Sequence, residues 1–159
     1  PFPTARNELL SAFGRGRRSP ALGEPGWLNA SCLLLRTDAL REIRGFDERF
    51  FLFYEDADLG RRLYDRGWRS EVCAAARALH HGHQTITQPQ WGAEGPRHWQ
   101  RSRLLYLEQH CGRARAAVVV AAIRVTHALR ALKALAEGAP RQARALARLA
   151  AHDPRGPRA

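Results

Sequence analysis

An aromatic run leads directly into a helix at residues 45–59, which read Gly-Phe-Asp-Glu-Arg-Phe-Phe-Leu-Phe-Tyr-Glu-Asp-Ala-Asp-Leu. The aromatic part, residues 46–54, carries more ring area than a surface loop can hide, so we expect it to pack over another element. Leu59 and Leu63 recur four residues apart, which predicts a helix over residues 55–66. The segment therefore joins a buried aromatic strip to a helix start.

Three acidic residues crowd the first turn of that helix, namely Glu55, Asp56 and Asp58. The helix dipole favours negative charge at this end, so capping alone accounts for an isolated cluster of this kind. Burial among aromatic rings would raise the proton affinity of such a carboxylate, whereas the helix N-terminus would lower it. A carboxylate in this setting is a candidate general base. Asp47 and Glu48 sit in the preceding turn, where a structural role is expected.

Short apolar segments flank the aromatic run and predict strands. Residues 27–36 are mostly apolar, short and bounded by turn and capping residues, which is typical of a buried strand. Residues 68–76 and 77–79 predict one or two further strands, which run into His80-His81-Gly82-His83. The expected order is strand, short helix, aromatic segment, acid-headed helix, strand and histidine cluster.

The two ends of the chain differ in composition. Residues 1–26 are rich in Gly, Pro and Arg and predict a loop or linker. Residues 113–159 are rich in Ala, Leu and Arg and predict helices with a break at Gly138 and Pro140. This tail holds ten Lys or Arg against two acidic residues, which accounts for +8 of the formal charge of +11. A basic helical tail suits an anionic membrane surface, or else a solvated or partner-packed extension.

Length and composition limit the class of protein. A chain of 159 residues, 45% of them apolar, suits one domain or part of one. The sequence shows no apolar run long enough to span a bilayer and no signal peptide, and its three cysteines lack the spacing of a disulfide framework or a zinc knuckle. These features favour a cytoplasmic location, free or peripheral at the inner face of the membrane. The chain starts at Pro1 and contains no Met, so we expect a fragment.

Five ordered motifs carry a family resemblance. They are WLNASCLLLR at 27–36, GFDERFFLFYEDADL at 45–59, Arg62, Gly67-Trp68 and His80-His81-Gly82. Together they resemble the second half of family 2 glycosyltransferases, notably rhamnosyltransferase-like members, over roughly residues 1–112. The resemblance implies an α/β fold in which residues 27–112 form the C-terminal, acceptor-side half of a GT-A domain, followed by a helical extension. The donor-binding half would be missing, and this fragment alone would be inactive.

The resemblance also implies a reaction. The complete enzyme would transfer a sugar with inversion from a nucleotide-sugar donor to a glycan or lipid-linked acceptor, as in bacterial cell-wall or polysaccharide biosynthesis. Asp56 matches the general base, which takes the proton of the attacking acceptor hydroxyl. Glu55, Asp58, Trp27 and Asn29 would lie near the acceptor or sugar, because an indole suits the apolar face of a sugar and an amide suits its hydroxyls. Core packing of Trp27 is the alternative.

A divalent metal, Mg or Mn, is expected in the complete enzyme by the same resemblance. His80 matches a histidine that in some members completes the metal shell with the donor diphosphate, and His81 and His83 are weaker candidates. Such an ion would stabilise the departing nucleotide diphosphate as a Lewis acid. Asp56 and Asp58 also form an Asp-x-Asp, but the metal-binding motif of that form lies in the N-terminal half of the family, so we do not assign it here.

Two other classes of function fit parts of the sequence. A metal-dependent hydrolase would use Glu55, Asp56, Asp58 and His80 around a metal-bound water, and it would bind metal tightly without any donor half. A non-catalytic Arg-rich module would bind nucleic acid or a membrane through its charge. Its arginines form no recognisable nucleic-acid motif, so we do not expect a nucleic-acid partner.

Overall fold

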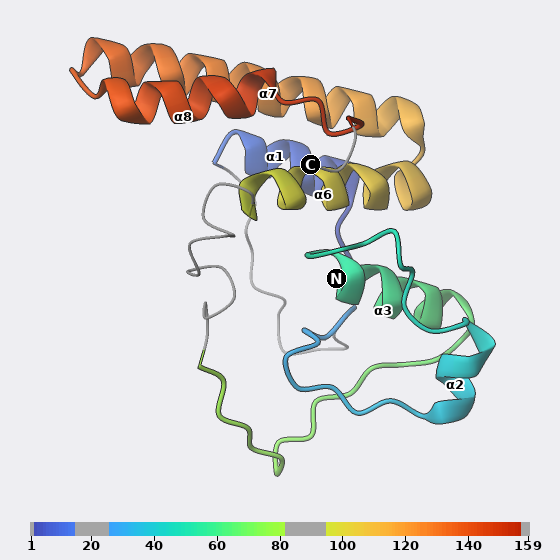
Figure 1. Ribbon diagram of the computed structural model, residues 1–159. Coiled ribbons are helices and arrows are strands. Elements are labelled where there is room, and N and C mark those ends of the chain that lie inside the picture. Colours follow the sequence, from blue (N-terminus) through green and yellow to red (C-terminus); the bar gives the residue numbers. More distant parts are fainter. Residues whose placement is uncertain (1, 15–25, 82–94, 157–159) are drawn as a thin grey trace. The chain divides into compact units, whose positions relative to one another are not determined.

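The computed structural model describes residues 2–14, 26–81 and 95–156, and within these ranges the regular structure is helical (Figure 1). The helices are α1 (Ala5–Ala12), α2 (Thr37–Glu42), α3 (Glu55–Asp65), α6 (Gly95–Cys111), α7 (Arg113–Ala136) and α8 (Pro140–Ala151). None of the helices that the structure describes is long and apolar enough to cross a bilayer. Helix α1 lies inside the segment 1–26 for which a loop was predicted, so that expectation was wrong for residues 5–12.

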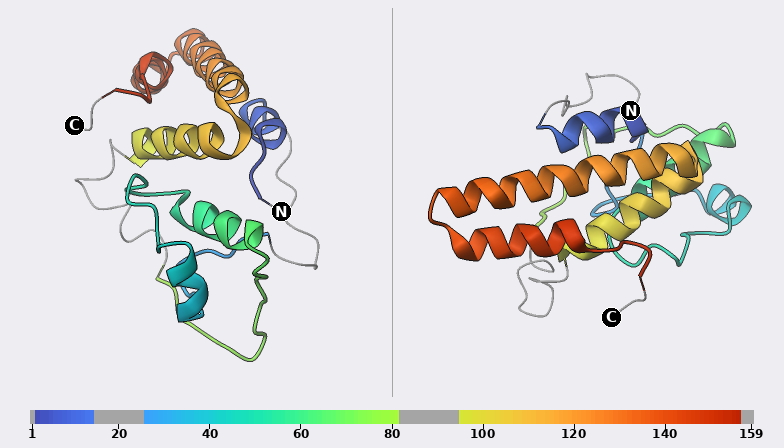
Figure 2. Two further views of the ribbon diagram at one scale, coloured as in Figure 1. Left: turned by 90° about the vertical axis from the view of Figure 1, so that its right-hand side faces the viewer. Right: turned by 90° about the horizontal axis from the view of Figure 1, so that it is seen from above.

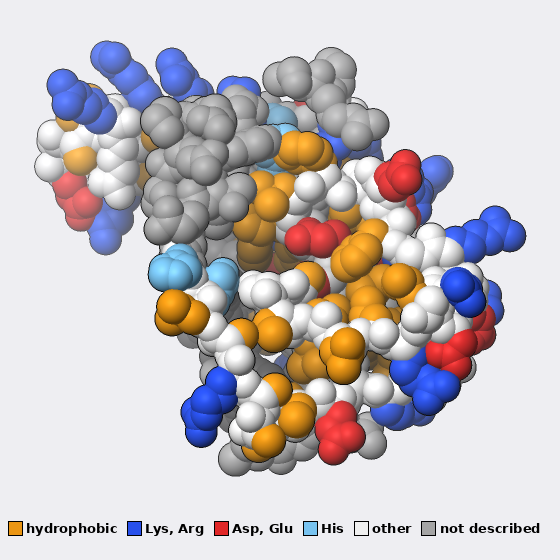
Figure 3. Space-filling model, turned by 60° about the horizontal axis from the view of Figure 1, so that its bottom comes forward, with side chains coloured by type: hydrophobic (Ala, Val, Ile, Leu, Met, Phe, Trp, Pro, Cys, Tyr) orange, Lys and Arg blue, Asp and Glu red, His pale blue; other side chains and the backbone are white. Residues whose placement is uncertain are grey.

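The predicted α/β fold was wrong, because the described part of the chain contains no strand. The two segments predicted as strands, 27–36 and 68–79, are irregular and contain short turns. Neither forms a strand ladder with the other or with any other described segment. A strand needs a neighbour about 4.8 Å away to complete its hydrogen bonds, and apolar composition does not supply that neighbour. Leu34 is 98% exposed and Leu79 is 83% exposed. Figure 3 shows many hydrophobic side chains open to solvent on one face.

The chain divides into two compact units, each described here by itself. Among the described residues, the first unit comprises residues 2–3, 26–81 and 95–102, and the second comprises residues 4–14 and 103–156. Helix α6 contributes to both, because its residues before 103 belong to the first unit and the rest to the second.

The core of the first unit forms around α3. Leu59 and Leu63, one helical turn apart, are buried with Ala39 of α2, and Ile43 and Trp68 pack against them. Helix α2 ends before two residues with left-handed backbone, and the second of these is a glycine whose N–H donates to the carbonyl of Leu40. This turn returns the chain toward the aromatic run. Helix α3 follows that run, and its bounds agree to within one residue with those predicted from the leucine spacing.

The core of the second unit lies between α1, α7 and the later part of α6 (Figure 2). Its buried residues are Leu104, Leu107, Ala116, Val119 and Ile123. Helices α7 and α8 run antiparallel side by side, joined at Gly138 with φ of 72° and at Pro140 in the first turn of α8. Arg124 of α7 donates from Nε to the carbonyl of Ala150 at 2.9 Å, which satisfies an otherwise open carbonyl at the end of α8.

Candidate active site at the start of helix α3

The backbone that delivers the first turn of α3 is strained. Phe53 and Tyr54 both have left-handed backbone angles, with φ of 68° and 64°. Each such non-glycine residue costs about 1–3 kcal/mol, so the rest of the unit must hold the turn in place. The turn ends at once in α3, so its conformation sets where the three acidic residues of the first turn point.

The first part of α6 holds this turn. The Trp99 ring meets the rings of Phe53 and Tyr54 edge-on, at centroid distances of 5.1 and 5.4 Å. The Ser102 hydroxyl donates to the carbonyl of Leu52 at 2.7 Å. The expectation that the aromatic run packs over another element is therefore confirmed for Phe53 and Tyr54, which meet α6. Phe46 and Phe51 are 44% and 55% exposed, so the run is not buried throughout.

Asp56 is a largely buried carboxylate, with 9% of the residue exposed. One carboxylate oxygen accepts the N–H of Ala57 at 2.8 Å, and the other accepts the N–H of Ala30 at 3.3 Å. Burial raises the pKa of Asp56, and the two amide hydrogen bonds act in the opposite direction without cancelling that rise. The structure thus combines a raised proton affinity with fixed donors that orient the carboxylate.

The two neighbouring acids have different surroundings. Burial raises the pKa of Glu55, with a further contribution from the charge of Asp56. One oxygen of Glu55 is buried without a hydrogen-bond partner in the described part of the molecule. Asp58 is fully buried and accepts from Nε of Arg62 at 2.7 Å. Asp58 is therefore part of the internal support of α3, and its position gives no support to the predicted acceptor contact.

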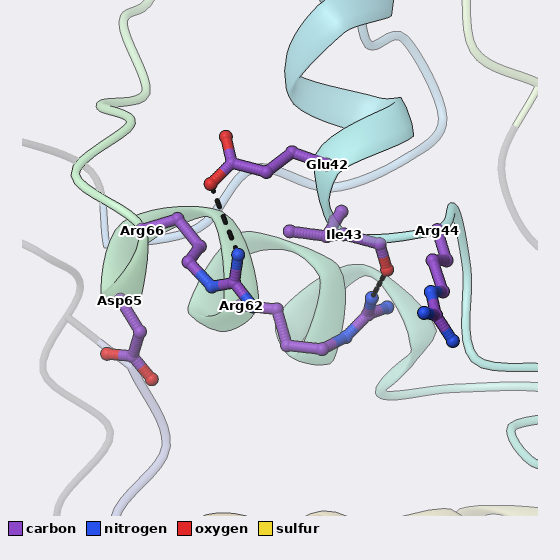
Figure 4. Close-up of a pocket in the computed structure, with 6 residues that line it drawn as sticks. All are labelled: Glu42, Ile43, Arg44, Arg62, Asp65 and Arg66. Atoms are coloured by element: carbon purple, nitrogen blue, oxygen red, sulfur yellow. Dashed lines mark hydrogen bonds and ion pairs between the residues drawn. The ribbon is translucent and has the colours of Figure 1, made fainter.

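Arg62 links Asp58 to the preceding turn. Its Nη1 donates to the carbonyls of Ile43 and Gly45, at 2.9 Å each. The end of α2 and the buried face of α3 are thereby joined through one guanidinium. A polar hollow of about 490 Å³ lies beside this link, and its lining residues are Glu42, Ile43, Arg44, Arg62, Asp65 and Arg66 (Figure 4). It contains none of the predicted site residues, and Arg66 is turned toward Glu42 within it.

Trp27 lies against α3 at Gly60. A methyl group placed on Gly60 would stand 2.9 Å from Cβ of Trp27, so only glycine permits this approach. The approach carries the chain past the helix start, where Ala30 donates its N–H to Asp56. Trp27 is half-buried by this packing. Asn29 is exposed, and its side-chain oxygen accepts the N–H of Ser31 at 2.9 Å.

The histidines do not complete a metal centre in the described chain. His80 and His81 are exposed, and His83 lies outside the described residues. Among the residues that the structure describes, no three His, Cys, Asp or Glu side chains are grouped so that they could hold an ion. The described residues therefore do not bring Glu55, Asp56, Asp58 and His80 together as the hydrolase alternative requires. The divalent metal expected in the complete enzyme stays a prediction. Asp47 accepts the N–H of Arg49 at 3.0 Å, in line with its expected role in the turn.

Sequence reasoning missed four contributors to the site. Gly60 could have been found, because a glycine inside a helical pattern often marks a close packing contact. The N–H of Ala30 carries no sequence signal, since every residue except proline has one. Trp99 and Ser102 follow the aromatic run by more than forty residues, and no spacing rule connects them to it.

Comparison with known proteins confirms the resemblance to rhamnosyltransferase-like glycosyltransferases. Over 108 residues, or 67% of this chain, the sequence is 38% identical to N-acetylglucosaminyl-diphospho-decaprenol L-rhamnosyltransferase of Mycobacterium tuberculosis. It is 39% identical over 57 residues, 35% of this chain, to 4% of the O-antigen biosynthesis protein RfbC of Myxococcus xanthus. The chain spans only 34% of the length of the mycobacterial relative. No family model and no solved structure matches.

Proposed function

We propose that this chain supplies the acceptor side of an inverting, family 2 glycosyltransferase site, with Asp56 as general base. The observation that carries the proposal is the setting of Asp56, a buried carboxylate of raised pKa held by two backbone amides at a helix start. A general base works best when its pKa approaches the operating pH, and burial moves Asp56 in that direction.

The reaction would be a single displacement. The acceptor hydroxyl oxygen forms a bond to the anomeric carbon while the bond from that carbon to the nucleotide diphosphate breaks, and the hydroxyl proton passes to a carboxylate oxygen of Asp56. The amides of Ala30 and Ala57 keep the carboxylate from rotating away as the proton arrives. Attack from the side opposite the leaving group inverts the anomeric centre.

The substrates are proposed from the relatives. The mycobacterial protein is named as a rhamnosyltransferase acting on N-acetylglucosaminyl-diphospho-decaprenol. We accordingly propose a nucleotide-linked deoxyhexose as donor and a lipid-linked glycan as acceptor, used at the inner face of the membrane. Exposed Asn29 and the free edge of Trp27 would contact the sugar. Mg or Mn stays a prediction for the complete enzyme.

The test replaces Asp56 by Asn in the complete enzyme and measures sugar transfer to a lipid-linked acceptor. Removing a general base lowers kcat by about a hundredfold or more, while KM for the acceptor changes little. Asp65→Asn is the matched control, because Asp65 is a half-exposed acid on the same helix and pairs with Arg61 on the surface. Full turnover by a folded Asp56→Asn enzyme would show that Asp56 is not the base.

A further inference from the structure

Helix α7 has two apolar faces, and the described residues cover only one of them. Ala116, Val119 and Ile123 on one face are buried in the core of the second unit. Val118 and Val125 point elsewhere, and they are 59% and 55% exposed. A solvent-facing helix surface is normally polar, so a second apolar face requires an explanation.

The uncovered face is continuous. Five aliphatic residues with 55–63% exposure follow one another at spacings of seven, four, three and three residues, which keeps them on one side of an α-helix. This α7 stripe consists of Val118, Val125, Leu129, Leu132 and Leu135. Alanines occupy further positions on the same side, at 121 and 128 between the stripe residues and at 114 and 136 beyond its two ends. The stripe therefore contains no polar side chain over the length of α7.

Basic residues border the stripe on both sides. Helical spacing places Arg115 and Lys133 along one edge and Arg113 and Arg124 along the other. Arg124 also donates to carbonyls at the end of α8, and Lys133 pairs with Glu137 at 3.6 Å, so Arg113 and Arg115 are the main cations offered to lipid along α7. Helix α8 adds three exposed arginines at positions 141, 144 and 148. Residues 113–159 contain ten Lys or Arg but only two acidic residues, Glu137 and Asp153. An uninterrupted aliphatic face with cationic edges is complementary to a surface that is apolar beneath and anionic above.

We propose that the α7 stripe lies on an anionic lipid bilayer, parallel to its surface. The valines and leucines would enter the boundary between headgroups and acyl chains, and the basic edges would meet the lipid phosphates. A protein partner fits less well, because interface cores favour aromatic residues and Met, which the stripe lacks. A second copy would place two strongly basic tails against each other. The inference stands on α7 and does not depend on the function proposed for Asp56.

The experiment is co-sedimentation of the 159-residue chain with lipid vesicles. We expect binding to vesicles of phosphatidylglycerol and phosphatidylcholine, weaker binding as salt rises, and little binding to phosphatidylcholine alone. Leu129→Glu with Leu132→Glu should lower the partition coefficient about tenfold or more. The control pair Gln142→Glu with Ala145→Glu makes the same charge change at exposed positions of α8, and it should lower binding by about threefold at most.

Two further measurements test whether the stripe meets lipid or a second copy of the chain. Leu129→Trp places a fluorophore on the stripe, and brominated anionic lipids should quench it more than they quench the wild-type tryptophans. Equal losses in the two double variants, or no added quenching, would overturn the proposal. A dimer in sedimentation velocity that dissociates in the Leu129→Glu, Leu132→Glu variant would overturn it in favour of a second copy.

Discussion

Residues 27–36 and residues 113–136 are both rich in apolar side chains, yet only the second segment forms regular structure. Helix α7 completes its backbone hydrogen bonds within its own sequence, so it needs a partner only for its side chains. Residues 27–36 need a neighbouring strand to complete theirs, and the described chain offers none. Apolar composition therefore determines a helix locally, whereas it determines a strand only together with a second segment.

The same difference governs how the two units are held. The first unit depends on contacts between distant residues, such as Arg62 with the carbonyls of Ile43 and Gly45 and Ala30 with Asp56. The helical hairpin of α7 and α8 depends mainly on bonds within each helix. Single substitutions should therefore affect the first unit more. Trp27, Trp68 and Trp99 lie in that unit, so fluorescence reports on it, while far-UV circular dichroism mainly reports on the helices.

The largest effect is expected for Arg62→Leu. This change removes the 2.7 Å partner of the fully buried Asp58, which keeps its attraction to Arg49, and it removes the donor of two carbonyls. Breaking a buried pair in this way costs about 3–5 kcal/mol. The free energy of unfolding, measured by urea denaturation with tryptophan fluorescence, should fall by that amount. Arg66→Leu, one turn later, removes only an exposed pair with Glu42 and should cost about 1 kcal/mol or less. Equal shifts would remove the distinction between the two arginines.

Gly60→Ala should have the next largest effect. The added methyl would stand 2.9 Å from Cβ of Trp27 and must displace it, at a cost of about 1–3 kcal/mol. In an open helix the same change would stabilise by about 1 kcal/mol. A double-mutant cycle with Trp27→Gly separates the steric cost from the gain in helix propensity, because the Trp27→Gly variant lacks the Cβ that opposes the added methyl. The cost of Gly60→Ala should fall sharply or change sign there, and an unchanged cost would contradict the packing argument.

The pH dependence of stability gives a smaller effect that is specific to Asp56. Folded Asp56 binds its proton more tightly than the unfolded chain, whose carboxyl has the ordinary pKa of 3.8. Stability from this residue is therefore present below pH 3.8 and falls as pH rises through the raised pKa. Asp56→Asn removes that fall. The free energy of unfolding of the variant should therefore rise relative to that of the wild type as pH increases from 3.8 through the raised pKa, and the difference should persist at higher pH.

Asp38→Asn provides the opposite sign as a control. The Arg36 hydrogen bond lowers the pKa of Asp38 to about 2. Wild type should therefore lose stability relative to Asp38→Asn as pH falls from 3.8 to about 2. Denaturation at several pH values measures both differences, and slopes of the same sign would contradict the assigned surroundings of one residue.

The smallest effect is expected in the hairpin. Arg124→Gln removes the donor to the carbonyls of Ala150 and Ala151, at 2.9 and 3.3 Å. These carbonyls can turn to water, so the loss should be about 0.5–1 kcal/mol and should show as faster amide exchange in the last turn of α8. Exchange that is faster throughout α7 would mean that the hairpin depends on distant contacts as strongly as the first unit does.

The sequence predicted some helices closely, but it missed α1, and both of its strand predictions were wrong. Leucine spacing predicted α3 with an error of one residue, and Gly138 with Pro140 marked the break between α7 and α8. Both signals act within a few residues, so local rules capture them. Strand pairing acts between distant segments, and the apolar runs that predicted strands at 27–36 and 68–79 carried no information on a partner.

The candidate site divides in the same way. The acids at the start of α3 were visible because their spacing is local. Their different environments were not visible, since Arg62 pairs with Asp58 while two backbone amides of the described chain donate to Asp56. The support from Trp99 and Ser102 also depends on how α6 packs, which no motif in the aromatic run records.

The contact between Ala30 and Asp56 is made by a backbone amide, so it does not depend on the side chain at position 30. Any residue other than proline at position 30 can donate the same hydrogen bond. The side chains of residues 28–31 can therefore change while the hydrogen bond that orients Asp56 stays in place. Under the function proposed for Asp56, the base would keep this amide donor whatever side chains stand beside it.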